Sequence, residues 1–399
     1  MSLTKHDRRY GLGFLNRSTR NRFYRQHLPG GVVSELFMPD DRNGVNMDAL
    51  RAGLIGCGTI GRNHASTLDQ LGEEIAAVAD IDPDARGSVA ADFGASDTYE
   101  DYERMVAESD LDLVVVAVPN ALHADCAVAA LEADLDVFVE KPLAATLAGA
   151  RRIEAAAADS DGRCMIGYVK AFDPVFEDVR ARALDGEFGR IYDIDIEYVR
   201  RRGIPKLGGW FTRKALSGGG ALVDAGVHAL HLALTVLEFP DIETVSAVTG
   251  ANFGTRDDYT YLSMWGGDSE PDPEFSTEDY ARALVRTADG TALHLHCTWA
   301  GNTDPRKNVR VQGTKAGLTV TETDDSDPVL YGTDRGALTD TALQHPDEGP
   351  FERQWSYFAD VVRDKRDHTR NTVAEGVAVQ RLVEAMYKSA DEGGEVQLG

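Results

Sequence analysis

The sequence predicts an α/β protein in which a doubly wound parallel sheet precedes a second domain built on long alternating strands. Three observations predict this fold: a glycine-rich loop at 56–61 between a short apolar strand and a helix, apolar runs that alternate with helical segments over 73–169, and strands of alternating polarity after residue 189. A chain of 399 residues is long enough for two hydrophobic cores. We therefore expect an extension over 1–46, a first folded domain over 47–170 and a second over 171–399.

The chain is strongly acidic, with 66 acidic against 41 basic residues and a formal net charge of −25. Such a surface repels nucleic acid, so we expect no nucleic-acid partner. The carboxylates are spread along the chain, which favours a surface adapted to a high-salt cytoplasm, because the Debye length falls to about 3 Å at about 1 M salt. An acidic protein of an ordinary cytoplasm is the alternative.

The apolar runs and the cysteines bear on the compartment. No apolar run approaches the roughly 18–20 residues that a membrane span requires, so we expect no membrane partner. The four cysteines show no C-x-x-C spacing, which argues against a disulfide framework and a zinc knuckle and suits a reducing, cytoplasmic compartment. These cysteines are Cys57, Cys126, Cys164 and Cys297.

The first 46 residues differ from the rest, since they hold eight basic and four acidic residues. "RRYGLGFL" at 8–15 partly resembles a twin-arginine export signal, but the polar "NRSTRNRFYRQ" stands where an apolar stretch should follow, so we expect no export. A disordered arm, or an over-extended gene start ahead of Met47, are the two interpretations.

The loop "GCGTIG" at 56–61 fits the dinucleotide-binding pattern G-x-G-x-x-G. Gly56 would make the tight turn, Gly58 would let the backbone approach a pyrophosphate, and Gly61 would let the helix pack on the strand. The next strand ends at Asp80, where a carboxylate would bind ribose hydroxyls and repel a 2′-phosphate, so we expect NAD; the nearby Arg86 leaves NADP possible. The expected cofactor residues of this region are Gly56, Cys57, Gly58, Thr59, Ile60, Gly61 and Asp80.

Two further strands end beside this loop. The apolar runs "DLDLVVVAVP" and "LDVFVEKPLA" read as parallel strands buried on both faces. Ligands of such sheets bind beyond the carboxyl ends of the strands, which places Pro119, Asn120, Glu140 and Lys141 at the cofactor edge. A surface lysine is the less favoured interpretation of Lys141.

The stretch "GGGALVDAGVHALH" at 218–231 places three glycines ahead of Asp224 and His228. The spacing predicts a helix over 221–237 on which Asp224 and His228 share one face, so the carboxylate could orient the imidazole for acid–base chemistry. The glycines indicate backbone that approaches something closely. A plain helix start with an ordinary polar neighbour is the alternative.

The second domain reads as a sheet with one wet face, because residues 189–201, 281–301 and 308–323 alternate apolar and polar side chains. A large sheet without helices on one face would expose apolar residues unless another subunit covered it, so we expect a homodimer or homotetramer. The segment "GGDSEPDPEFSTE" at 266–278 reads as an acidic loop.

Together the loop at 56–61, "VPNALH" at 118–123, "EKP" at 140–142, "GYVKAFDPVF" at 167–176 and the glycine-rich stretch at 218–231 resemble the glucose-fructose oxidoreductase, inositol dehydrogenase and rhizopine-catabolism family. The resemblance runs from about residue 51 to the end. It implies a Rossmann domain, then a domain with a large, mostly antiparallel open sheet. It also implies hydride transfer between NAD or NADP and a carbinol carbon of a sugar, inositol or sugar acid.

The resemblance also assigns roles to residues. It implies Lys141, Asp224 and His228 as the catalytic set, with the three glycines closing a loop over nicotinamide and substrate. The implied cofactor residues at the strand ends are Pro119, Asn120, His123 and Glu140. The implied substrate residues are Lys141, Tyr168, Lys170, Asp224 and His228. The chain departs from many members at Ala171 and His231, so no particular sugar specificity can be transferred.

Three other functions stay open at this point. A metal site could use Asp224, His228 and His231, or the "HLHC" stretch at 294–297, although alternation on a strand separates Cys297 from His294 and His296. We expect no metal. A non-catalytic, cofactor-binding regulator and an NAD-dependent, glycosidase-type relative are the remaining alternatives.

Overall fold

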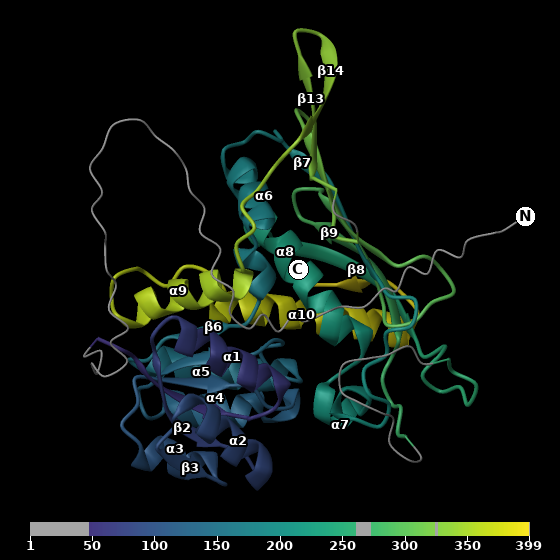
Figure 1. Cartoon of the computed structure of the whole chain (residues 1–399). Coiled ribbons are helices and arrows are strands. Elements are labelled where there is room, and N and C mark those ends of the chain that lie inside the picture. The colour runs from purple at the N-terminus through teal and green to yellow at the C-terminus, as the bar shows by residue number, and fades with distance from the viewer. Residues whose placement is uncertain (1–47, 261–272, 324–325, 399) are drawn as a thin grey trace, which may run out of the picture. The chain divides into compact units, whose positions relative to one another are not determined.

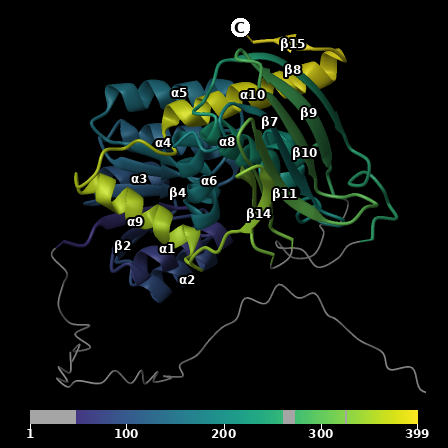
Figure 2. The ribbon, with the colours of Figure 1, turned by 90° about the horizontal axis from the view of Figure 1, so that it is seen from above.

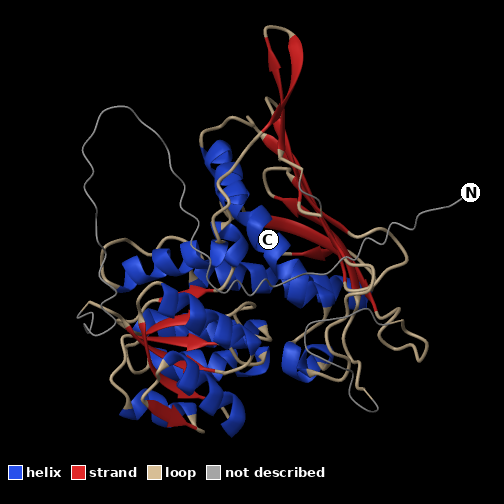
Figure 3. Ribbon diagram, in the orientation of Figure 1, coloured by secondary structure: helices blue, strands red, loops and turns tan. Residues whose placement is uncertain are grey.

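The structure, a computed structural model, describes residues 48–260, 273–323 and 326–398 (Figures 1 and 3). The expected extension over 1–46 and residues 266–272 of the expected acidic loop lie outside the described residues.

The first part of the described chain forms a parallel six-stranded sheet in the order β3-β2-β1-β4-β5-β6. Its central strands are short apolar runs such as "LVVV" and "DVFV", whose side chains are all buried, as parallel strands covered on both faces require. The strand order reverses between β1 and β4, which makes the carboxyl ends of these two strands the expected ligand site. The predicted doubly wound sheet is confirmed.

The strands of this sheet are β1 Arg51–Ile55, β2 Glu74–Ala79, β3 Asp97–Tyr99, β4 Leu113–Val116, β5 Asp136–Val139 and β6 Cys164–Ile166. The connecting helices are α1 Thr59–Gln70, α2 Pro83–Phe93, α3 Tyr102–Glu108, the 3₁₀ turn η1 Asn120–Leu122, α4 His123–Leu131 and α5 Leu147–Asp159.

The second part contains a nine-stranded sheet in the order β14-β13-β12-β11-β7-β10-β9-β8-β15. Strands β7 and β10 run parallel, and the other neighbouring pairs run antiparallel. The expected mostly antiparallel sheet is therefore confirmed, including the turn at Asp289–Gly290 that joins β9 to β10.

Its strands are β7 Ile191–Val199, β8 Ile242–Gly250, β9 Tyr280–Thr287, β10 Ala292–Thr298, β11 Arg306–Gly313, β12 Gly317–Thr321, β13 Val329–Asp334, β14 Ala337–Ala342 and β15 Val396–Gln397. Its helical segments are η2 Val169–Phe172, α6 Pro174–Leu184, η3 Trp210–Thr212, α7 Lys214–Ser217, the π-helical turn η4 Leu222–Gly226, α8 Val227–Val236, α9 Pro350–Val362 and α10 Val373–Glu392.

Helices α6, α8 and α10 lie on one face of this sheet, and no helix of the described chain covers the other face (Figure 2). The outer face is polar, with Asp193, Asp195 and Glu197 of β7 turned outward while Ile194 and Ile196 are buried. Ion pairs run across the strands, including His294–Asp193 at 3.2 Å and Arg310–Asp195 at 3.0 Å. The alternation makes this face mostly polar, but it also carries apolar side chains, since Val248 of β8 is 55% exposed and Leu284 of β9 lies on the same face.

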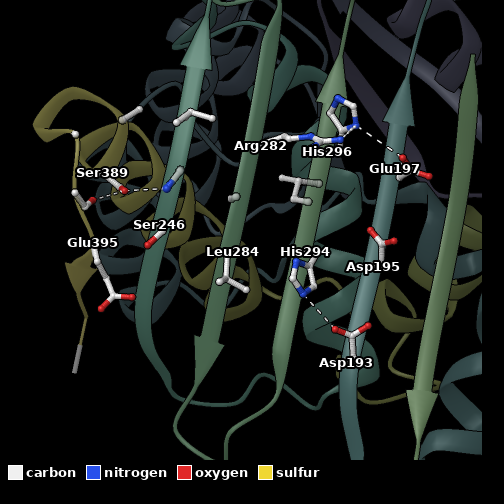
Figure 4. A pocket seen from close by; sticks show the side chains of 17 residues that line it. Asp193, Asp195, Glu197, Ser246, Arg282, Leu284, His294, His296, Ser389 and Glu395 are labelled. Atoms are coloured by element: carbon white, nitrogen blue, oxygen red, sulfur yellow. Dashed lines mark hydrogen bonds and ion pairs between the residues drawn. The ribbon is translucent and has the colours of Figure 1, made fainter. Parts of the chain in front are cut away.

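The outer face also carries a hollow of about 740 Å³ (Figure 4). It is lined by side chains of β7, β8, β9 and β10 and by the end of α10, among them Glu197, Arg282, His296 and Glu395. None of the expected catalytic residues lines it.

Helices α9 and α10 return from the second part to the first. Trp355 of α9 stacks on Phe138 of β5 with ring centroids 4.4 Å apart, inside the core of the six-stranded sheet. Helix α10, which begins with a capping box of Thr372 and Glu375, packs against both α5 and β8. The boundary between residues 170 and 171 stays a prediction.

One described helical segment, Lys214–Val236, is long and apolar enough to cross a membrane. Its most apolar window is 89% buried inside the fold, as expected for the core helix of a globular domain.

Candidate active site

The glycine-rich loop joins β1 to α1, and its backbone geometry fits the three roles that its spacing predicts. Gly56 has φ +99°, and an added Cβ would collide with the carbonyl of Ala117 on the neighbouring strand. At Gly61 a Cβ would collide with the carbonyl of Gly56, so this glycine lets the helix pack on the turn. At Gly58 a Cβ would meet no heavy atom within 4 Å, so backbone there borders open space, as close approach of a pyrophosphate requires.

The N-terminus of α1 has features that favour the binding of an anion. Gly58 is its N-cap and supplies no side-chain hydrogen bond, and the first turn contains no acidic residue. The first N–H groups therefore keep their capacity to bind phosphate oxygens. Thr59 and Ile60 are exposed beside them. These features fit a bound dinucleotide.

Asp80 follows β2, and its carboxylate accepts a hydrogen bond from the glycine-rich loop at 56–61. Its Oδ2 accepts a hydrogen bond of 2.6 Å from the N–H of Cys57, and its Oδ1 accepts one of 2.8 Å from the N–H of Asp82. Each oxygen keeps a lone pair that a ribose hydroxyl could use. Arg86 donates to the backbone carbonyl of Asp80, so a cation does lie at this edge. Burial raises the pKa of the Cys57 thiol to about 12, so Cys57 is no nucleophile.

The segments after β4 and β5 are held together by side chains expected to bind cofactor. Asn120, which follows Pro119, donates a hydrogen bond of 2.7 Å to the carbonyl of Ser217, just ahead of the three glycines. His123 is buried, with Nδ1 2.8 Å from the carbonyl of Pro142 and Nε2 2.9 Å from that of Val118. These contacts hold η1 and α4 against Pro142, the residue after Lys141, and against Ser217, and the cofactor roles of Asn120 and His123 stay predictions.

Glu140 belongs to a buried chain of hydrogen bonds. Trp355 Nε1 donates to His64 Nδ1 at 3.0 Å, and His64 Nε2 lies 2.8 Å from Glu140 Oε1. Because an indole N–H only donates, His64 accepts at Nδ1 and its Nε2–H donates to the carboxylate. Glu140 Oε2 also accepts from the backbone N–H of Lys141 at 3.0 Å. Burial tends to raise the pKa of Glu140, but the hydrogen bond from His64 and nearby positive charge bring it below its usual value.

Lys141 and Asp224 form an ion pair between the two parts of the fold. The ammonium of Lys141 donates to Asp224 Oδ1 at 3.2 Å and to the Asp224 backbone carbonyl at 3.1 Å. Asp224 Oδ2 accepts from Arg200 at 3.2 Å and from the indole of Trp299 at 2.8 Å. Burial tends to raise the pKa of Asp224, but Lys141, Arg200 and the Trp299 hydrogen bond bring it well below its usual value. The aspartate is therefore an ionised anchor for the lysine.

His228 lies on the same helical segment and is partly exposed. Its Nδ1 is buried without a hydrogen-bond partner among the described residues. Burial, together with the positive charge of Lys141, brings the pKa of His228 well below 6.5, so the imidazole is neutral at pH 7. A neutral imidazole beside a lysine ammonium can accept a proton while the ammonium stabilises a developing oxyanion.

The predicted pairing of Asp224 with His228 is not formed. Asp224 lies in the π-helical turn Leu222–Gly226 and His228 in α8, so the regular α-helical spacing is interrupted between them. The aspartate uses both oxygens for Lys141, Arg200 and Trp299, and no hydrogen bond joins it to His228 in the described part of the chain. Asp224 therefore orients the lysine rather than the imidazole.

The three glycines face protein. Gly218 has φ +81°, and a Cβ there would collide with the carbonyl of Ala145. A Cβ at Gly219 would collide with the hydroxyl of Tyr387, and one at Gly220 with the carbonyl of Glu278. Each glycine of the run therefore lets a neighbouring segment of the chain approach its backbone, and the expected approach to nicotinamide and substrate stays a prediction.

Glu278 holds the start of the helical segment that carries Asp224 and His228. Its carboxylate accepts hydrogen bonds of 2.9 Å from the N–H groups of Gly220 and Leu222, and one of 3.0 Å from Tyr387. Glu278 ends the stretch expected to be an acidic loop, yet its side chain is buried. The sequence did not indicate this role of Glu278, because the residues around it have the composition of a solvent-exposed loop.

The expected substrate residues Tyr168 and Lys170 lie next to this group. The buried ring of Tyr168 stacks on His231 at 4.1 Å between centroids and stands edge-on to His228 at 6.4 Å. Lys170 forms ion pairs with Glu322 and, at 3.4 Å, with Asp173. His231 is one of the positions at which the chain departs from many members of the resembled family, and its buried ring therefore packs against the ring of Tyr168.

No group of three or more His, Cys, Asp or Glu side chains among the described residues is placed to hold a metal ion. Asp224 is surrounded by the cations Lys141 and Arg200, which repel a metal. His294 lies on the outer face of the nine-stranded sheet, whereas Cys297 is buried on the other side.

Comparisons with known proteins agree over most of the chain. The profile of the GFO_IDH_MocA oxidoreductase family, with an NAD-binding Rossmann fold, matches residues 50–168, and the profile of the GFO/IDH/MocA C-terminal domain matches residues 176–319. D-glucoside 3-dehydrogenase of Escherichia coli (strain K12) is 30% identical over 374 residues, which cover 90% of this chain and 100% of the relative.

Two further proteins extend the comparison. D-xylose 1-dehydrogenase (NADP(+)) 2 of Haloferax volcanii is 27% identical over 349 residues, covering 87% of this chain and 99% of the relative. The crystal structure of GenD2 from gentamicin A biosynthesis, in complex with NAD, has a TM-score of 0.71 and 28% identity, covering 91% of this chain and 99% of that one.

Proposed function

Because the chain belongs to the GFO/IDH/MocA family of NAD-binding oxidoreductases, we propose that it is an NAD-dependent dehydrogenase acting on a carbinol carbon of a sugar, an inositol or a sugar acid. One observation carries the proposal. An ammonium, Lys141, is anchored by the ionised Asp224 beside the neutral imidazole of His228, at the carboxyl edge of a sheet that carries a dinucleotide loop.

In the proposed oxidation His228 accepts the hydroxyl proton of the substrate. Since Nδ1 is buried, Nε2 is the ring nitrogen that would take this proton. NAD, when bound, takes up the carbinol hydrogen with its electron pair. Lys141 donates a hydrogen bond to the substrate oxygen, and its charge stabilises the alkoxide that develops as the proton leaves. Asp224 and Glu140 hold Lys141 by its ammonium and its backbone.

Asp80 supports a preference for NAD, since its carboxylate faces the place expected for the ribose hydroxyls. Arg86 and the NADP named for one relative keep NADP as a second cofactor to be tested.

A direct test is NADH formation by the purified protein with a panel of aldoses, glucosides, inositols and sugar acids, at about 0.1 M and about 1 M KCl. We expect at least one member to reduce NAD, and Lys141→Met to lower kcat for this reaction by roughly 10² to 10⁴. A protein that binds NAD but turns over none of the panel would instead be a regulator. Net hydrolysis of a glycoside without NADH release would identify the glycosidase-type alternative.

We propose that the enzyme functions in a reducing cytoplasm of high salt concentration. Its four cysteines are free and buried, and its net charge of −25 needs screening. Calorimetry of the cofactor-free protein should show thermal stability rising from about 0.1 M to about 1 M KCl, as the Debye length falls from about 10 Å to about 3 Å. Equal stability across this range would contradict the proposal.

We also propose a homodimer or homotetramer that uses the outer face of the nine-stranded sheet. The support is the uncovered face itself, where Arg310 of β11 lies beside the acidic β7 and Arg282 lies two strands away on β9, so a second copy could pair with it in opposite orientation. Light scattering should give a multiple of 43.3 kDa, and Asp195→Arg should reduce it. A monomer at all concentrations would contradict this.

A further inference from the structure

A second charged cluster borders the reacting residues, and it consists of Lys170, Lys307 and Glu322. One oxygen of Glu322, Oε2, accepts from both lysines, at 2.8 Å from the ammonium of Lys307. Burial tends to raise the pKa of Glu322, but the two ammonium groups bring it below its usual value. We refer to these three residues as the lysine clamp.

The sheet register places Lys307 beside the catalytic ion pair. Lys307 of β11 pairs with Tyr198 of β7, and its ammonium lies 5.2 Å from the centre of the Tyr198 ring. Two residues further along the chain, Arg200 reaches Asp224. Alternate residues of a strand share a face and lie about 7 Å apart, so Lys307 and the Asp224–Lys141 pair are neighbours on the inner side of the sheet.

Lys170 approaches the same place from the other side. It follows Tyr168 by two residues in η2, and the Tyr168 ring stands edge-on to His228. After burial and Lys141, the charges of Lys307 and Lys170 also contribute to the low pKa of His228. The clamp is therefore close enough to the imidazole to act on it electrostatically.

The two lysines are not equally neutralised. Lys170 has two carboxylates, Glu322 and Asp173, whereas Glu322 is the one carboxylate of the described chain that pairs with the ammonium of Lys307, which also lies against Lys170. An ammonium has three N–H donors, so Lys307 keeps donors for a ligand. Its side chain is 36% exposed, against 22% for Lys170 and 16% for Glu322.

We propose that Lys307, backed by Lys170 and Glu322, binds an anionic oxygen group of the substrate, so that the preferred substrates are sugars carrying a carboxylate or a phosphate ester. This inference rests on the proposed dehydrogenase function and narrows its substrate class. A sugar bound with its reacting hydroxyl at Lys141 and His228 would present another substituent of the ring to Lys307. A charge-assisted hydrogen bond in this partly buried place would favour the anion over a neutral hydroxymethyl group.

The bound anion would also act on the base. Because positive charge lowers the pKa of His228, an anion at Lys307 would partly cancel it and make the imidazole a better proton acceptor. An anionic substrate should therefore show a higher kcat as well as a lower KM than its neutral counterpart.

The test compares matched hexose, hexuronate and hexose 6-phosphate of gluco, galacto and manno configuration, by NAD reduction. We expect kcat/KM for at least one anionic member to exceed that of its neutral partner by about tenfold or more, as one charge-assisted contact provides. The carboxylate and phosphate arms identify which anion fits.

Two variants and a control sharpen the test. Lys307→Met should remove most of the anion preference, because kcat/KM for the anionic sugars should fall relative to that for their neutral partners. Glu322→Gln should increase the preference, because it removes a carboxylate that competes for the same ammonium. Lys315→Met, which removes an exposed lysine at the turn of the same β11–β12 hairpin, should leave the preference unchanged.

The outcomes separate this inference from the function on which it rests. Wild-type protein that oxidises neutral hexoses as well as their anionic partners, or a Lys307→Met variant that keeps the preference, overturns the inference and leaves the dehydrogenase intact. A protein that oxidises none of these sugars, nor any member of the wider panel, overturns both.

Discussion

The molecule contains two glycine-rich segments, and they have different neighbours. In the loop at 56–61 one glycine, Gly58, borders open space at the start of α1. In the run at 218–220 every glycine faces another segment of the chain. The first segment leaves room for a ligand, whereas the second removes side chains so that the start of the following helical segment can pack against Ala145, Tyr387 and Glu278.

This difference shows what a glycine motif can and cannot indicate. Glycine reports that something comes close to the backbone, but the sequence does not say what it is. For the first segment, the strand before and the helix after fix the answer, because that arrangement always turns free N–H groups towards the loop. For the second, the neighbours come from residues about 60 to 170 positions further along the chain, and from Ala145 before it, so the structure is needed to identify them.

The largest expected effect separates chemistry from cofactor binding. If the loop at 56–61 binds NAD and Lys141 acts in the chemistry, Lys141→Met should lower kcat by roughly 10² to 10⁴ and leave the Kd for NAD within about threefold. Steady-state kinetics and calorimetric titration measure the two quantities. The control is Lys365→Met, which removes an exposed lysine after α9. If Lys141→Met weakened NAD binding by the same factor as it lowered kcat, the assignment of Lys141 to chemistry rather than to cofactor binding would be contradicted.

Exchanging one glycine in each segment tests the comparison directly. Gly58→Ala should weaken NAD binding by about tenfold with little change in thermal stability, because its Cβ enters the space expected for the pyrophosphate. Gly220→Ala should lower the free energy of unfolding by about 3 kcal/mol or more, because its Cβ meets the rigid carbonyl of Glu278. Thermal melts with and without NAD measure both. A stable, active Gly220→Ala protein would show that the helix start is not tightly packed.

The pH dependence of kcat/KM reports on His228. The base must be neutral to accept a proton, and its pKa lies well below 6.5 because of burial and Lys141. Activity should therefore stay constant as pH falls from about 8 to about 6, whereas a base of ordinary pKa would lose half its neutral form at about 6.5. An acid limb centred near about 6.5 would show that the imidazole is not shifted in this way.

The smallest expected effect concerns the choice between NAD and NADP. Wild-type protein should show a higher kcat/KM with NAD than with NADP. Asp80→Asn should lower the ratio of kcat/KM for NAD to that for NADP by several-fold, because repulsion of the 2′-phosphate is lost. Arg86→Met should raise this ratio. A wild-type preference for NADP would show that Arg86, and not Asp80, governs this edge.

Much of the fold could be predicted from the sequence, because continuous apolar strands and alternating ones differ in pattern. The placement of Lys141 next to Asp224 follows from the motifs, but their direct ion pair does not. Arg200 and Trp299 were missed because each lies in an ordinary-looking strand end, and only the pairing of β7 with β10 brings them to Asp224. The polar outer face could be predicted, because the alternating "YDIDIEY" contains its carboxylates, whereas the ion pairs across it depend on the register of the strands.

The buried network behind Lys141 shows the same limit. His64 stands in α1 and Trp355 in α9, 291 positions apart, yet they share a hydrogen bond that fixes Glu140. Nothing in the local pattern of either helix indicates such a partner, since both residues occupy positions that an apolar core residue would fill equally well.

The most direct test of the account is the single-turnover rate of NADH formation by His228→Asn, measured at saturating NAD with a substrate found in the panel. Asparagine keeps a polar side chain at this place but cannot accept the proton, so we expect the rate to fall by roughly 10² to 10⁴ with the Kd for NAD unchanged. The matched control, His294→Asn on the outer face of the nine-stranded sheet, should keep the wild-type rate. A His228→Asn protein that forms NADH at the wild-type rate would contradict the assignment of this imidazole as the base.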